Sequence, residues 1–405
     1  MIIMKKRNKW TRPHHRIVRN VLNATLGVYA RLKYGAKIIP LKEKCERQYL
    51  VLYNHQTGFD QFFVGMVFKK PLYYVASEDI FSMGILSKII KGLVAPIPIK
   101  KQTTDPRAII NCVKVAREGG SIAIAPEGNR TYSGTLANIK PTIAQLAKHL
   151  RLPIAFVKIE GGFGVQPRWS DAIRRGEMAV GISNILEYED FGQMSDDALA
   201  ELIEKELSVV EAPTKKRYRH KKRAEFIERA IYVCPRCGLS TLRSKGARIS
   251  CTKCSLSAEY GEDLELRFDG DYSPFRYLSE WYEYQCSYIN SSDFSSFTDE
   301  QLYEDTAGLY EVILYKNKKR LCKNAKVSLF GDRIEIRTDV DILSLPFSEL
   351  RAASVLGKNK LNLYHGTKVY QLKGDKRFSA LKYVNVFYRY TNLAKGAKNV
   401  EFLGL

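Results

Sequence analysis

The stretch VLYNHQTGFD, residues 51–60, places a histidine and an acid where they could carry out proton chemistry. An imidazole accepts a proton from a hydroxyl near neutral pH when its other nitrogen is held by a carboxylate or carbonyl. His55 and Asp60 are five positions apart, an offset of about 140° on a regular helix. They can therefore meet only if His55 lies in a loop and Asp60 lies in the first turn of the following helix.

A second interpretation of the same residues is purely structural. Thr57 and Asp60 have the spacing of a capping box, in which Thr57 would be the N-cap of a helix and Asp60 its reciprocal partner. Taken alone, the stretch favours this cap. The two interpretations are compatible, because an acid in the first turn could also face back toward His55.

The stretch APEGNRTYSG, residues 125–134, follows an apolar run and is a second candidate for chemistry. Gly128 allows a sharp turn, so Glu127 and Arg130 are expected at the functional edge of a sheet. Arginine suits phosphate because its planar fork donates two parallel hydrogen bonds. The alternative is a surface turn with an incidental ion pair.

Two further stretches could serve the same edge. Lys100 and Lys101 follow the apolar run VAPIPI and add positive charge at another strand end. The glycines of EGGFG, namely Gly161, Gly162 and Gly164, could form a loop of backbone donors, although a glycine turn is the simpler interpretation.

Four cysteines form the pattern CPRC-x13-CTKC, which supplies Cys234, Cys237, Cys251 and Cys254. Two such knuckles complete a tetrahedral thiolate site, and the spacing is typical of a zinc ribbon. Since four thiolates leave no open coordination position, we expect a structural zinc. No organic cofactor is expected. The alternative is disulfide pairing, which the scattered remaining cysteines of a reduced, intracellular protein argue against.

Strand-like and helix-like runs alternate from about Gln48 to Ser183, which predicts an α/β domain with a largely parallel or mixed sheet. The expected strands are YLVLY, LYYVAS, VAPIPI, SIAIAP, PIAFVKI and MAVGIS. The expected helices cover residues 60–68, 81–91, 105–118 and 141–150. His55 and Glu127 both follow strands, where functional residues of such sheets gather.

The C-terminal third has a different texture. An aromatic-rich helix over 275–288 precedes seven short strand-like runs, the first of which is YEVILY, and an amphipathic helix over 378–392 ends the unit. This order predicts a small α+β barrel. The predicted domains are an N-terminal helix 1–40, an α/β domain 41–212, a basic linker 213–230, a zinc ribbon 231–262 and a barrel 270–405.

The net charge of +22 indicates a polyanionic partner. Basic residues cluster in the first 48 residues and in KKRYRHKKR, residues 215–223. After Pro13 an apolar stripe with flanking arginines predicts a basic amphipathic helix, either a monotopic membrane anchor or a helix packed on its own domain. Because no apolar run is long enough to span a bilayer, we expect a peripheral protein at the cytoplasmic face of the cell membrane.

Together these stretches resemble the four ordered blocks of the glycerolipid acyltransferase family, across about 49–164. NHQTGFD resembles its His-x4-Asp block, PIPIKK the second block, PEGNR the third and LPIAFV the fourth. The resemblance implies that His55 is the general base and Asp60 its orienting acid. It also implies phosphate binding by Glu127, Gly128 and Arg130, with Lys100 and Lys101 from the second block.

Two departures from the family pattern concern the acceptor. Lys101 stands where the second block usually ends in arginine, and Phe156 stands where the fourth block usually has a second proline. A lysine neutralises phosphate but cannot fork to it. The C-terminal unit resembles a pleckstrin-homology-like barrel through its architecture alone.

The resemblance implies transfer of an acyl group from acyl carrier protein or coenzyme A to 1-acyl-sn-glycerol-3-phosphate, a lysophospholipid, at an anionic membrane. Two alternatives remain. One is an inactive relative that serves as a lipid-binding scaffold. The other is a nucleic-acid-binding protein, since zinc ribbons and high positive charge are common there. A basic, aromatic base-reading strip is not evident in the ribbon, which argues against nucleic acid.

Overall fold

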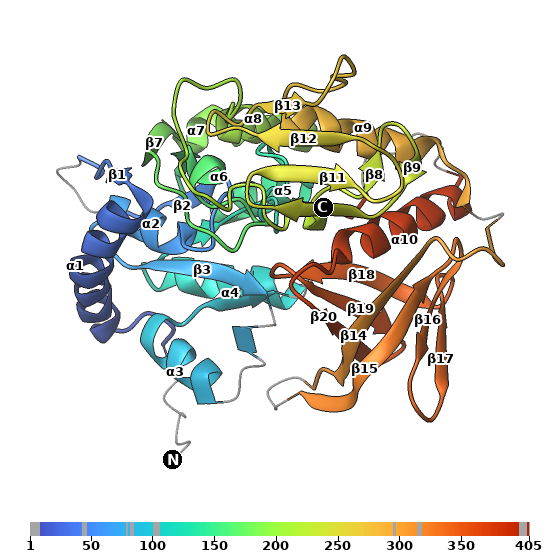
Figure 1. The fold of residues 1–405 in the computed structure, drawn as a ribbon. Coiled ribbons are helices and arrows are strands. Elements are labelled where there is room, and N and C mark those ends of the chain that lie inside the picture. Colours follow the sequence, from blue (N-terminus) through green and yellow to red (C-terminus); the bar gives the residue numbers. More distant parts are fainter. Residues whose placement is uncertain are drawn as a thin grey trace.

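A mixed seven-stranded sheet forms the centre of the N-terminal half of this computed structural model (Figure 1). The structure describes residues 9–42, 47–77, 80–81, 85–99, 106–294, 297–313, 318–396 and 403–404. The strand order is β1-β7-β6-β2-β5-β3-β4, and β6 and β7 are the antiparallel neighbours. The strands are β1 (Ala36–Ile38), β2 (Leu50–Tyr53), β3 (Leu72–Ser77), β4 (Ile97–Ile99), β5 (Ser121–Ile124), β6 (Ile154–Glu160) and β7 (Met178–Leu186).

The six predicted strands of this sheet are all present, and β1 is an addition that the sequence did not indicate. Central strands β2 and β5 are buried along their whole length, which explains their continuous apolar runs. The helices of this half are α1 (His14–Tyr34), α2 (Asp60–Val67), α3 (Ile85–Val94), α4 (Pro106–Arg117), α5 (Thr142–Leu150), α6 (Gly162–Val165), α7 (Tyr188–Phe191) and α8 (Asp196–Leu207).

Helix α1 divides its apolar side chains between two faces. Val18, Leu22 and Leu26 line a cavity inside the domain, whereas Ile17 and Val21 are 65% and 57% exposed. The predicted stripe therefore packs on its own domain and also leaves an apolar strip at the surface. No helix among the described residues is both long and apolar enough to cross a membrane.

The segment that contains the four cysteines forms two small sheets at the top of Figure 1. Residues before it include the turn η2 (Ile227–Arg229). A two-stranded sheet joins β8 (Val233–Cys234) to β9 (Gly238–Leu239). A four-stranded antiparallel sheet follows, with β10 (Leu242–Lys245), β11 (Arg248–Cys251), β12 (Ser257–Tyr260) and β13 (Leu266–Phe268).

The C-terminal unit is an antiparallel sheet of seven strands with the order β17-β16-β15-β14-β20-β19-β18. Its first strand therefore lies beside its last. The strands are β14 (Tyr303–Glu311), β15 (Lys319–Leu329), β16 (Arg333–Arg337), β17 (Ile342–Pro346), β18 (Leu350–Leu356), β19 (Lys360–His365) and β20 (Lys368–Gly374). Helix α9 (Leu278–Ser291) precedes the sheet, and α10 (Ala380–Ala394) packs on β18 and β19.

One predicted strand of this unit was misplaced. The run YEVILY, residues 310–315, was expected to be the first strand, but β14 begins at Tyr303 and ends at Glu311. Polar residues of β14 such as Glu304 and Thr306 hid the strand, because one face of it is turned away from the core.

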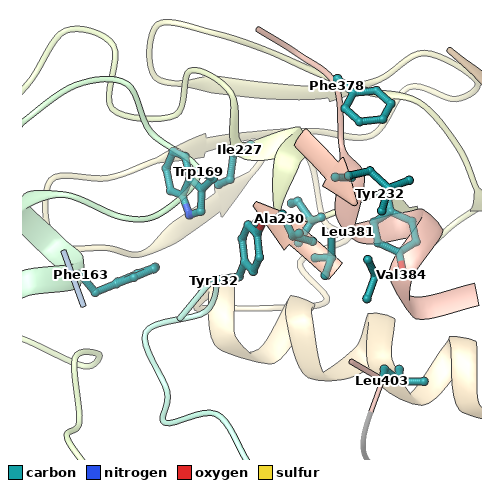
Figure 2. Packing of buried hydrophobic residues seen from close by; sticks show 14 of the residues in the cluster. Tyr132, Phe163, Trp169, Ile227, Ala230, Tyr232, Phe378, Leu381, Val384 and Leu403 are labelled. Atoms are coloured by element: carbon teal, nitrogen blue, oxygen red, sulfur yellow. The ribbon is translucent and has the colours of Figure 1, made fainter. Parts of the chain in front are cut away.

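The parts of the chain share one apolar core, as Figure 2 shows where they meet. Tyr132 and Trp169 come from the N-terminal half, Ile227 and Tyr232 precede or join the cysteine segment, and Leu381 comes from α10. All these side chains are buried. The C-terminal unit is thus packed against the rest of the chain through this shared core.

Candidate active site

The loop between β2 and α2 is fixed to the neighbouring strand before it presents any functional side chain. The Asn54 side-chain amide donates to the carbonyl of Ile159 at 2.9 Å, and its oxygen accepts from the amide of the same residue at 2.8 Å. Asn54 is buried. This paired contact to β6 sets the direction in which the chain leaves the sheet.

Asp60 is fully buried and its carboxylate organises the loop. Oδ2 accepts from the amide of Gln56 at 2.6 Å, and the carboxylate accepts from the amide of Thr57 at 2.9 Å and from its hydroxyl at 2.6 Å. The carboxylate also lies 2.8 Å from Nδ1 of His55. The histidine and the acid therefore meet as the loop-then-helix arrangement requires.

The predicted N-cap at Thr57 is wrong. Helix α2 begins at Asp60, and the residue before it, Phe59, makes no side-chain cap hydrogen bond. Thr57 instead lies within the loop, where its amide donates to Asp60 as the reciprocal half of a capping box would. The acid serves the loop and the histidine together.

His55 is held as a neutral imidazole with one free nitrogen. Burial lowers its pKa, and the hydrogen bond to Asp60 offsets this effect only in part. Because the carboxylate accepts at Nδ1, the proton of the neutral ring belongs on Nδ1 and Nε2 is left as an acceptor. The side chain is 24% exposed and lines the cavity described below. This is the form that a general base needs.

Glu127 ties the PEGNR turn to the histidine loop. Its Oε1 accepts from the amide of His55 at 2.6 Å, and its Oε2 accepts from the amide of Ala137 at 3.0 Å. Burial raises the pKa of Glu127 to about 8 despite these two amides. Thr131 completes the junction by donating its amide to the carbonyl of His55 at 3.1 Å. Both carboxyl oxygens are thus used for positioning, and the phosphate-binding role of Glu127 stays a prediction.

The guanidinium of Arg130 lies near the loop that carries His55. No ion pair or hydrogen bond of that group occurs within the described parts of the chain. Burial, followed by the charge of Arg168, lowers its pKa to about 10. Its Nη1 would lie 3.7 Å from a Cβ added to Gly58, which places it beside the histidine loop. Gly128, at φ +68°, makes the turn that brings Arg130 here.

The other predicted site residues are the two lysines of the second block and the glycines of EGGFG. Lys100 and Lys101 lie outside the described residues. The EGGFG stretch opens α6, and its Gly161 amide donates to the buried carboxyl of Glu211 at 2.8 Å. That amide is therefore already engaged and does not face the histidine as a free donor.

A cavity of about 1140 Å³ begins at His55 and extends under α1 and α3. Glu127 and Gly128 lie at its polar end, and most of its lining is aliphatic or aromatic. Apolar lining residues come from separate elements, including Leu22, Tyr74, Leu93, Ile109, Ile124 and Leu146. Sequence reasoning missed this cavity. The sequence feature that relates to it is the part of the α1 apolar stripe formed by Val18, Leu22 and Leu26.

The four cysteines converge on one point. Their sulfur atoms all lie within 4.8 Å of one another. The Cys234–Cys254 and Cys237–Cys251 sulfur pairs are 3.7 and 3.5 Å apart, close to the roughly 3.8 Å edge of a tetrahedral zinc–thiolate site. These distances are too long for disulfides. The cluster could bind a metal ion.

The fold and the site define an α/β enzyme with a histidine–carboxylate pair at the mouth of an apolar cavity. Comparison with known proteins identifies the class. Residues 33–160 match the family model described as Acyltransferase. Residues 33–160 are thus similar to the acyltransferase family, and the relatives named below support an acyltransferase enzyme.

Individual relatives are distant. The chain is 24% identical over 183 residues to the 1-acyl-sn-glycerol-3-phosphate acyltransferase of Bacillus subtilis, which covers 44% of this chain and 88% of that protein. It is 22% identical to the chloroplastic 1-acyl-sn-glycerol-3-phosphate acyltransferase BAT2 of Brassica napus, over 41% of this chain and 48% of that protein. A crystal structure of the 1-acyl-sn-glycerophosphate acyltransferase PlsC of Thermotoga maritima is similar with a TM-score of 0.40 at 17% identity, covering 49% of this chain and 80% of that one.

Proposed function

We propose that the protein transfers an acyl group from a thioester, acyl carrier protein or coenzyme A, to the free hydroxyl of 1-acyl-sn-glycerol-3-phosphate. The observation that carries this proposal is the neutral His55, held by buried Asp60 at the mouth of a large apolar cavity. The names of the distant relatives support the same acceptor.

The proposed reaction is a direct transfer. Nε2 of His55 takes the proton of the acceptor hydroxyl while the oxygen attacks the thioester carbonyl. The tetrahedral intermediate then collapses, the carbon–sulfur bond breaks, and the imidazolium returns its proton to the leaving thiolate. Asp60 stabilises the imidazolium that forms between these steps, because its carboxylate already accepts from Nδ1.

The cavity would hold the acyl chain. An apolar chain gains about 0.8 kcal/mol for each methylene moved out of water, and the cavity lining supplies the required apolar surface. Arg130 would bind the acceptor phosphate, with Lys101 added by family resemblance. A fixed phosphate would in turn hold the acceptor hydroxyl against the histidine, in the orientation that proton transfer needs.

The four cysteines would hold a structural zinc ion as a zinc ribbon. Nearby donors fit a thiolate, since the hydroxyl of Ser240 lies 2.9 Å and the amide of Lys253 lies 3.4 Å from the sulfur of Cys251. The C-terminal sheet would be a pleckstrin-homology-like barrel, which its strand order and its final helix support. The domain boundaries given above are part of the same proposal.

The enzyme would work at the cytoplasmic face of the cell membrane as a peripheral protein. Ile17, Val21, Val28 and Leu32 form one exposed apolar stripe on α1. Exposed Ile85, Ile89 and Leu93 add a second stripe on α3, which contacts α1. Both helices also line the cavity, so a lipid substrate could enter from the bilayer side.

Acyl transfer tests the proposed function directly. Purified protein, lysophosphatidic acid and an acyl thioester should release free thiol, with coenzyme A and acyl carrier protein tried as separate donors. His55→Ala should lower kcat by about 10² to 10⁴-fold, the usual contribution of a general base. His365→Ala, which removes a partly exposed histidine at the end of β19, should leave turnover unchanged. Equal turnover in wild type and His55→Ala would contradict the mechanism, and absence of turnover with either donor would favour a lipid-binding scaffold.

Membrane attachment should depend on the α1 stripe. Wild-type protein is expected to sediment with phosphatidylglycerol vesicles, and the double variant Ile17→Glu/Val21→Glu should remain in the supernatant because it places charge in the apolar strip. Val340→Glu, at a 94% exposed position before β17, is the matched control and should still bind. Equal binding by the double variant would remove α1 from the membrane-facing surface.

Metal analysis tests the zinc ribbon. The purified chain should contain about one zinc ion, and Cys254→Ser should lose it and unfold at a lower temperature. Acyl transfer by Cys254→Ser should persist at low temperature, because the cluster is proposed to be structural. Cys322→Ser, in β15 and outside the cluster, should keep the metal. A wild-type chain without metal would overturn the zinc assignment.

A further inference from the structure

The turn between β18 and β19 reaches from the C-terminal sheet to the PEGNR stretch. Arg168, only 3% exposed, connects them. Its guanidinium donates to the carbonyls of Val355 and Gly357 at 3.2 Å each. It also donates to the carbonyl of Arg130 at 3.1 Å. One buried side chain thus joins the C-terminal unit to the residue proposed to bind phosphate.

The next residue of that turn, Lys358, brings a second cation into the same region. Its Nζ lies 3.0 Å from a carboxylate oxygen of Asp171, and its side chain is 28% exposed. Burial lowers the pKa of Lys358, the hydrogen bond and charge of Asp171 oppose this effect, and the charges of Arg130 and Arg229 lower the pKa further. These charged groups are therefore close enough to influence one another.

The charges in this region do not balance. Four cations are present: Arg130, Arg168, Arg229 and Lys358. Within the described parts of the chain, the carboxylates that act on these cations are Asp171 and Asp60. Asp171 already pairs with both Arg229 and Lys358. Asp60 is engaged by His55 and by the loop amides. Buried positive charge is costly unless an anion accompanies it.

We propose that Lys358 and Arg130 together form the site for the phosphate of the acyl acceptor, so that the C-terminal sheet takes part in acceptor recognition. Arg168 is the positioning residue that holds the turn against the PEGNR stretch. This inference rests on the proposed function and extends it. The site favours a phosphate monoester, whose charge at neutral pH is about −1.5 to −2. A phosphodiester headgroup carries one negative charge and cannot offset the same excess.

Acceptor selectivity tests this inference. The Michaelis constants for lysophosphatidic acid and lysophosphatidylglycerol are measured for wild type and for Lys358→Gln. The variant should raise the Michaelis constant for the monoester by about tenfold, the typical effect of one lost charge-assisted hydrogen bond. It should leave kcat unchanged and reduce the preference over the phosphodiester. Lys358→Arg should restore most of the preference, and Lys368→Gln, an exposed lysine of the same sheet, should behave as wild type.

The positioning role of Arg168 has its own readout. Arg168→Lys keeps the charge but cannot donate to all the carbonyls that the guanidinium joins. It should raise the same Michaelis constant and lower the same preference while kcat is retained. A residue that served only stability would lower the melting temperature and affect the two acceptors equally.

The outcomes separate this inference from the proposed function. If wild type transfers acyl groups and Lys358→Gln keeps its Michaelis constant and preference, the inference is wrong and the function stands. If wild type transfers none, calorimetry with short-chain lysophosphatidic acid still decides the inference: weaker binding by Lys358→Gln supports it, and equal binding overturns it. A loss for Lys358→Gln that is equal for both acceptors and accompanied by a lower melting temperature would also overturn it.

Discussion

The buried carboxylate of Asp60 is the interaction on which the site depends. It takes hydrogen bonds from two successive loop amides, a hydroxyl and the imidazole of His55. A charge without solvent contact needs such partners, and here those partners are the loop itself. The geometry of the histidine is therefore set by the same contacts that make the buried charge tolerable. Glu127 adds a second constraint from the far side of the loop.

Buried, hydrogen-bonded side chains also join the α/β domain, the cysteine segment and the C-terminal unit to one another. Arg174 is fully buried between the aromatic rings of Trp169 and Tyr260, and it donates to carbonyls of Gly164 and Arg223. It thus links the α/β domain to the segment that holds the cysteines. Arg229 acts in the same way toward the C-terminal unit. It donates to the carbonyl of Trp169 at 2.8 Å and to that of Lys376 at 2.6 Å.

These contacts connect the cysteine segment and the C-terminal sheet to the α/β domain that contains the candidate active site. The small segment that contains the four cysteines packs beside the loop that follows β6, and a β-sheet extends one turn toward Arg130. Buried arginines are suited to such junctions because one guanidinium satisfies several carbonyls from different segments.

Local signals were sufficient for much of the fold. Short β-rich runs that alternate with helical patterns predicted the six strands of the α/β sheet, and the helices between them begin within a few residues of the predicted positions. His55 and Asp60 were predicted as a pair because NHQTGFD resembles the His-x4-Asp block, whereas the stretch alone favoured a helix cap. The cysteine cluster followed from spacing alone.

What the sequence did not disclose depends on distant contacts. The cavity is lined by side chains from α1, α2, α3, α4, α5 and four strands, so no single stretch carries its pattern. Arg168 lies in an ordinary polar loop, and its importance comes from carbonyls nearly two hundred positions away. The N-cap of α2 was misjudged because Asp60 satisfies the loop and not the helix end.

The central claim is that burial keeps His55 neutral while Asp60 holds its proton on Nδ1, which leaves Nε2 unprotonated. Nitrogen NMR of histidine-labelled protein measures both the tautomer and the titration. We expect the Nδ1–H tautomer at pH 7 and a pKa below 6.5, the ordinary value, because burial lowers it. In Asp60→Asn the pKa should fall further, since the hydrogen bond and charge of Asp60 raise it, and the tautomer preference should weaken. A His55 that is protonated at pH 7, or one whose tautomer and pKa do not respond to Asp60→Asn, would contradict the account.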